Sequence, residues 1–177
     1  MTKKYTSTFS AIHWIHAAIL IFILLGATFN LPDLPAKGGD LSPFKGHMIL
    51  GFVATVITLI RLFMLWKQPT LEPLDMGAFR ETIVRWNHRL IYLFLILTGV
   101  SGLATANSTS LGQVLIFGND PSVYGGPDGI TATLGTIHSI SAYTLMALIA
   151  MHVAGVIFYM IKSKENILGR VGFGKEG

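Results

Sequence analysis

Residues 131–161, TATLGTIHSISAYTLMALIAMHVAGVIFYMI, decide the fold of this chain. The stretch has no charged residue and is long enough to cross a bilayer as one helix. It carries two histidines, His138 and His152, fourteen residues apart. On a helix this spacing brings both imidazoles close to one face, about 40° apart, with about 21 Å between them along the axis. Because ionisable side chains are rare inside a membrane, each histidine is a candidate functional residue.

Three further apolar segments precede this one, at residues 9–29, 47–66 and 83–106. The chain has 177 residues, of which 51% are hydrophobic and only 12% are charged. Such a composition is typical of integral membrane proteins. The segments are too long and continuous for the alternating strands of a β-barrel. The sequence therefore predicts one domain, residues 1–177, built as an all-α bundle of four transmembrane helices.

The basic residues gather on one side of the predicted bundle. Four spans place both termini on the same side, and that side holds 11 of the 13 basic residues. They are Lys3, Lys4, Arg61, Lys67, Arg80, Arg85, Arg89, Lys162, Lys164, Arg170 and Lys175. Only Lys37 and Lys45 remain on the other side. By the positive-inside rule we expect both termini in the cytoplasm, and the positive charge reflects contact with anionic membrane lipid, with no nucleic acid partner.

The connecting segments have the composition of loops. Residues 30–46 are rich in proline and charge, and Gln68-Pro69 and Glu72-Pro73 end the second helix. Residues 107–130 are rich in Gly, Asn, Ser and Pro, but their centre, residues 111–117, is apolar enough for a short helix along the interface. We identify no soluble domain and no internal repeat.

The six histidines divide by their depth in the predicted membrane. His47 and His138 lie on the outer side, whereas His13, His16, His88 and His152 lie on the inner side. Two haems stacked across the membrane would need this layout. The chain has no cysteine, so a covalently attached haem is excluded and histidine must hold the iron. A bis-histidine haem on the outer side requires His47 with His138. On the inner side, spacing alone leaves His13, His16 and His88 as possible partners for His152.

Several polar residues near these histidines have two interpretations. His88 is close to the inner water and suits a haem propionate or quinone contact better than iron. Arg85 and Arg89 flank it, and they either pair with propionates or anchor the helix to anionic lipid. Lys45 is a candidate contact for an outer electron donor. A histidine at a membrane boundary is also often only hydrogen-bonded, which applies equally to His16.

Several short stretches resemble the bacterial cytochrome b-561 family. They are Ile12-His13-Trp14, Gly46-His47-Met48-Ile49-Leu50-Gly51, His88 with Leu90-Ile91-Tyr92, Ile137-His138 and His152. The resemblance covers nearly the whole chain and implies a four-helix membrane cytochrome with two haem b groups. It implies His13 and His152 as iron ligands of the inner haem, and His47 and His138 as those of the outer haem. The histidine of the third helix, here His88, is implied to lie near the quinone and not on iron.

The resemblance also implies a function and a location. Some members of the family resemble superoxide oxidases, which pass electrons from periplasmic superoxide to ubiquinone. We therefore expect an oxidoreductase of the bacterial inner membrane that carries electrons from a periplasmic donor, with superoxide favoured, to membrane ubiquinone.

Two other functions fit the same sequence. In the first alternative, the chain is the cytochrome b membrane anchor of a dehydrogenase or hydrogenase, with a redox partner protein. In the second, it is a haem-free transporter of metal ions or protons. The short outer loops argue against a large docking partner. The transporter is disfavoured because no acidic residue lies within the four apolar segments.

Overall fold

The computed structural model describes residues 4–31, 33–68 and 76–172. Its elements are α1 (Ser7–Asn30), α2 (Pro43–Leu65), α3 (Ala78–Ser108), α4 (Leu111–Leu115), the 3-10 helix η1 (Pro121–Val123), α5 (Gly129–Ser163) and the 3-10 helix η2 (Ile167–Arg170). Four of these, α1, α2, α3 and α5, are long and apolar enough to cross a membrane. The described residues contain no strand. The predicted four-helix transmembrane bundle is therefore confirmed.

The helices differ from the predicted segments mainly at their ends. α3 begins at Ala78 instead of residue 83, and its first turns carry Arg80 and Glu81. The apolar run marks only the part of a helix that needs an apolar environment, and the backbone continues as a helix into a polar region. The short helix predicted within residues 111–117 is present as α4.

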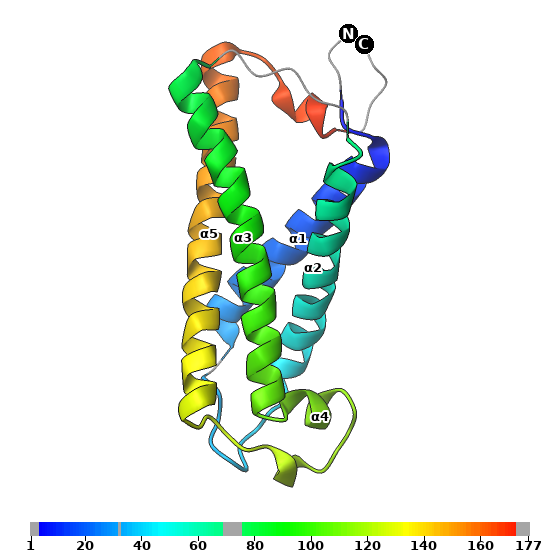
Figure 1. Cartoon of the computed structure of the whole chain (residues 1–177), viewed down its shortest axis with the longest axis vertical. Helices are drawn as coiled ribbons and strands as arrows, with labels where there is room; N and C mark the ends of the chain where they lie inside the picture. The colour runs from blue at the N-terminus through cyan, green and yellow to red at the C-terminus, as the bar shows by residue number, and fades with distance from the viewer. Residues whose placement is uncertain (1–3, 32, 69–75, 173–177) are drawn as a thin grey trace.

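The bundle consists of two helix pairs joined along one side. α3 packs on α5 along most of its length, α1 packs on α2, and α2 packs on α3 (Figure 1). Each spanning helix contributes one residue to a central apolar cluster of Leu20, Ala54, Leu95 and Leu145. Most large apolar side chains instead cover the outside of the bundle, as expected for a protein surrounded by lipid.

A glycine allows α2 and α3 to approach closely. A Cβ atom added at Gly99 of α3 would lie 2.5 Å from Oγ1 of Thr55 on α2, which is closer than real contacts allow. Thr55 is held in place because its hydroxyl donates a 2.8 Å hydrogen bond to the carbonyl of Gly51. Small residues at such crossings are typical of membrane helix packing, since close backbone contact replaces the hydrophobic driving force.

The first and last described segments meet at one end of the bundle. The Tyr5 N–H donates to the Arg170 carbonyl at 3.2 Å, and the Trp14 indole N–H donates to the Val171 carbonyl at 2.8 Å. We call this the inner end and the end that carries α4 the outer end (Figure 1). Several residues used in the predictions of topology and loops lie outside the described residues, namely Lys3, Lys175, Pro69, Glu72 and Pro73.

The loops of the outer end fold into a compact cap. Its apolar centre consists of Leu41, Phe44, Leu111 and Tyr124. The Tyr124 hydroxyl donates to the Pro35 carbonyl at 2.9 Å and so joins the two outer loops. Burial raises the pKa of this phenol. Residues 30–46 and 107–130 are therefore not independent irregular loops, because they share one apolar cluster.

The helix crossing at Gly99 yields a prediction about stability. Gly99→Ala should lower the free energy of unfolding by about 1–3 kcal/mol, because the new methyl group forces α2 away from α3. Gly26→Ala is the matched control, since a Cβ there meets nothing within 4 Å. Thermal unfolding in detergent, followed by circular dichroism, compares the two variants. Equal stability of Gly99→Ala and Gly26→Ala would contradict the packing described here.

Candidate functional site

Two histidines from different helices face each other near the outer end. The rings of His47 on α2 and His138 on α5 have centroids 5.9 Å apart and are nearly perpendicular, at 89°. A metal–imidazole bond is about 2 Å long, so two rings that hold one metal from opposite sides have centres roughly 6 Å apart. The structure thus brings together the two outer histidines that the sequence predicts as a pair, at a spacing that suits a shared metal.

The ring of His138 is oriented by the backbone of α3. Its Nδ1 lies 2.9 Å from the Thr98 carbonyl oxygen, which can only accept, so Nδ1 carries the hydrogen and donates it. This tautomer leaves Nε2 without a hydrogen and able to bind a metal. A carbonyl partner for the second ring nitrogen is the usual arrangement for a metal-binding histidine.

Space for a ligand exists beside this pair. A cavity of about 280 Å³ is lined by both histidines and by residues of α1, α2, α3 and α5, including Gly51, Gly99 and Gly102. A Cβ added at Gly102 would lie 2.9 Å from Cε1 of His138. The glycine therefore lets the imidazole lie against α3, which a larger residue would prevent.

The inner half of the bundle contains an arginine that the sequence analysis did not single out. Arg61 lies within α2, and its guanidinium donates to Nδ1 of His13 at 2.9 Å and to Nδ1 of His16 at 3.2 Å. From the sequence alone, Arg61 counts only as one of the basic residues of the inner side. Its position inside the apolar run 58–65 could have indicated a functional residue, because an ionisable residue within a membrane span is itself a candidate functional residue.

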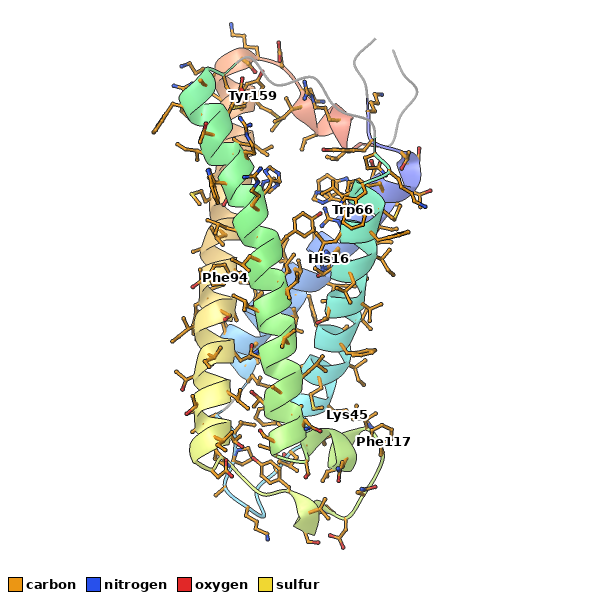
Figure 2. The ribbon with its side chains drawn as sticks, in the orientation of Figure 1. His16, Lys45, Trp66, Phe94, Phe117 and Tyr159 are labelled. Carbon is orange, nitrogen blue, oxygen red and sulfur yellow. The ribbon has the colours of Figure 1, made fainter. Side chains whose placement is uncertain are left out.

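His16 is a buried histidine with both ring nitrogens in use. Its side chain is fully removed from solvent (0% exposed), and its Nδ1 accepts from Arg61. Its Nε2 then carries the hydrogen and donates to Oγ1 of Thr58 at 3.3 Å, while the Thr58 hydroxyl donates to the Ala54 carbonyl at 2.9 Å. Figure 2 shows His16 within the bundle, beside α2. The contacts of His16 are those of a structural residue.

His13 differs from His16 in having one ring nitrogen without a hydrogen-bond partner. Its Nδ1 accepts from Arg61, and the ring packs edge-on against Trp14 with centroids 5.5 Å apart. Within the described part of the chain, no hydrogen bond engages its Nε2. The hydrogen of the neutral His13 ring is therefore on Nε2, and binding of a metal there would require this hydrogen to move to Nδ1 in place of the bond from Arg61. His13 as an iron ligand stays a prediction.

The structure brings His152 next to His88 and not next to His13. The two rings have centroids 4.8 Å apart at 83°. Nδ1 of His88 donates to the carbonyl of Val84, one turn earlier in α3, at 2.7 Å. His13, on α1, lies in the same inner half of the bundle, where it contacts Arg61. The resemblance-based pairing of His13 with His152 stays a prediction that no ring contact in the described residues tests.

The remaining candidates lie at the two ends of the bundle. The Arg89 guanidinium lies over the ring of Trp86 at 5.3 Å, on an exposed part of α3. Lys45 is exposed at the outer end, near α4 (Figure 2). Neither side chain contacts a histidine ring in the described residues, so their roles toward a propionate, a quinone or a donor stay predictions.

The arrangement of helices and histidines agrees with the comparison to protein families. A family model described as prokaryotic cytochrome b561 matches residues 4–174. The chain belongs to the prokaryotic cytochrome b561 family. No curated protein and no solved structure matches it. Membership identifies a multi-pass membrane protein of a haem b electron-transfer family.

The outer histidine pair fits the haem b that this family binds. Its two rings have a suitable spacing, and the His138 ring is held in the tautomer that leaves Nε2 for a metal. A cavity and small residues lie beside the pair. The inner half has several buried polar atoms without partners, namely Nε of Arg61, Oγ of Ser10 and Oδ1 of Asn87. Buried polar atoms without partners are costly, and a polar ligand group would relieve that cost.

The contrast between His13 and His16 yields a prediction about haem content. His16→Leu should keep the haem b content of the wild type and lower the stability by about 1–3 kcal/mol, because Arg61 and Thr58 lose a partner. His13→Leu should lose one haem per chain, because it removes the imidazole that the family resemblance assigns to the inner iron. Haem extraction and thermal unfolding of the two purified variants measure these effects. Loss of haem from His16→Leu with retention in His13→Leu would reverse the assignment.

Proposed function

We propose that the chain conducts single electrons across the membrane, from a small donor at the outer end to ubiquinone at the inner end. The spacing of His47 and His138 carries the proposal, because two imidazoles 5.9 Å apart beside a cavity suit one haem iron. We assign a second haem b to His13 and His152 in the inner half. When bound, haem b supplies reversible one-electron chemistry at its iron.

The protein's own side chains determine which chemistry is accessible. His47 and His138 would hold the iron of a bound haem b, and two imidazole ligands would favour electron transfer over binding of oxygen. The carbonyl of Thr98 holds the His138 ring in the tautomer that leaves Nε2 for the metal. Since His138 and His152 belong to the same helix, α5 fixes the separation between the outer and inner sites.

The proposed direction rests on charge and topology. We place both termini in the cytoplasm of a bacterial cell and the chain in its inner membrane, because the inner end holds most of the basic residues. The outer end then faces the periplasm. His88 and Arg89 at the inner end are the candidate contacts for a quinone headgroup or a haem propionate, because both are exposed there.

Superoxide is the donor that we favour. Each superoxide anion gives up one electron and becomes O₂, and ubiquinone takes two electrons and two protons to become ubiquinol. Two superoxide anions are therefore consumed for each ubiquinol formed. The outer end is not positive overall, since Asp33, Asp40, Asp120 and Asp128 outnumber Lys37 and Lys45. The net charge of the outer end therefore does not attract an anion, and a single nearby cation must do so. Lys45, two residues before His47, is the candidate for this local attraction.

The number of haems per chain tests the two-site proposal. The purified protein should show a low-spin b-type spectrum when the dithionite-reduced form is compared with the oxidised form, and extraction should give two haems per chain. His47→Ala should lose one of them, because His138 then lacks its partner. One haem in the wild type would leave a single site, and no haem would favour a transporter of metal ions or protons.

Consumption of superoxide tests the donor. In proteoliposomes with ubiquinone, superoxide should disappear faster than by spontaneous dismutation. Lys45→Gln should lower the second-order rate constant by a factor of about two to ten, because a local attraction is lost. Lys67→Gln at the inner end is the matched control and should have no effect. A rate equal to the spontaneous one, with both haems present, contradicts the donor, and a co-purified redox subunit would favour a membrane anchor.

A further inference from the structure

A groove runs between α1 and α5 on the outside of the bundle. Its volume is about 410 Å³, and every residue of its walls is apolar. Leu24 and Leu25 of α1 belong to one wall, and Met146 and Ala150 of α5 belong to the other. α1 packs on α2, and α5 packs on α3, far more than α1 and α5 pack on each other (Figure 1). In the part of the chain that the structure describes, the α1–α5 seam is therefore the least closed side of the bundle.

The groove and the outer cavity have two wall residues in common. Leu24 and Met146 line both hollows, whereas Ala150 lines only the groove, and His47 and His138 line only the cavity. Both shared side chains are half-buried. They therefore form the partition between the histidine pair and the lipid-facing groove. Because leucine and methionine have several rotamers, and methionine is especially adaptable, rotation of these two side chains can widen the partition.

The other walls of the cavity are held more firmly. On the side between α2 and α3, Thr55 lies against Gly99 at the close helix crossing. Toward the outer end, Leu31 and Met48 line the cavity and also pack on the apolar centre of the cap. The Tyr124 hydroxyl joins this cap to the first outer loop. Opening the cavity at either place requires the separation of packed elements, whereas the α1–α5 seam requires only a change of side-chain rotamers.

We infer that the α1–α5 seam is the route by which haem b enters and leaves the outer site, with Leu24 and Met146 as its gate. The inference rests on the proposed haem site of His47 and His138. Haem b is flat and largely apolar, so it partitions into a bilayer and reaches an apolar groove from the lipid without crossing the cap. Because entry and exit follow the same path, the rate of haem release from the loaded protein reports on the gate.

Transfer of haem from the loaded protein in lipid nanodiscs to excess apomyoglobin tests this route. The outer phase of the transfer is the one that His138→Ala removes. Met146→Ala should accelerate this phase about tenfold, the effect of lowering the barrier by about 1.4 kcal/mol, because it opens the partition. Leu103→Ala is the matched control, because Leu103 lines the cavity but not the groove, and should change the rate much less.

A cross-link over the groove tests the route without changing the cavity wall. The chain has no cysteine, so Leu25→Cys together with Ala150→Cys places the only two thiols on opposite walls of the groove. A short reducible cross-linker, added after haem is bound, should slow the outer phase about tenfold or more, and its cleavage by a thiol should restore the rate. Leu25→Cys alone, treated with the same reagent, should release haem at the wild-type rate.

The outcomes separate the route from the haem site itself. The alternative route passes through the outer cap, where Asp33 also lines the cavity. An outer phase that the cross-link leaves unchanged would overturn the lateral route, and acceleration by Tyr124→Phe would then favour the cap. Equal acceleration by Met146→Ala and Leu103→Ala would overturn the gate, because both would act only by loosening the cavity wall. A haem content that His138→Ala leaves unchanged would overturn the outer haem site and the route together.

Discussion

The meeting of His47 and His138 across α2 and α5 is the interaction on which the rest of the structure depends. It joins the two helix pairs of the bundle at the outer end, where the rings lie 5.9 Å apart. The same helix α5 brings His152 to a ring from α3, 4.8 Å away, in the inner half. One helix therefore presents an imidazole to a neighbouring helix at each of two depths.

The two halves of the bundle have different polar environments. In the outer half, a backbone carbonyl orients His138 and Gly102 allows the His138 ring to lie close to α3. In the inner half, a guanidinium connects two histidines of α1 to α2. Two similar histidine sites in one bundle would have similar chemical properties unless their surroundings differed. Arg61 and the Thr98 carbonyl are the features that make them different.

The sequence predicts much of the fold because hydropathy and residue spacing depend on one helix at a time. The four spans, the short helix α4 and the shared depth of His47 and His138 follow from that information. The contacts of Arg61, the burial of His16 and the ring contact of His88 with His152 do not. They depend on how each helix is rotated about its axis and on side-chain rotamers, which spacing along one chain does not determine.

The central claim is that α5 supplies an iron ligand to each of two haems. Electron paramagnetic resonance of the oxidised protein at low temperature, with spins counted per chain, tests it most directly. The account predicts two low-spin ferric signals per chain, both typical of bis-imidazole iron. His138→Ala should remove one of them together with its haem, and His152→Ala should remove the other. A single low-spin signal, or two signals that neither variant changes, would contradict the account.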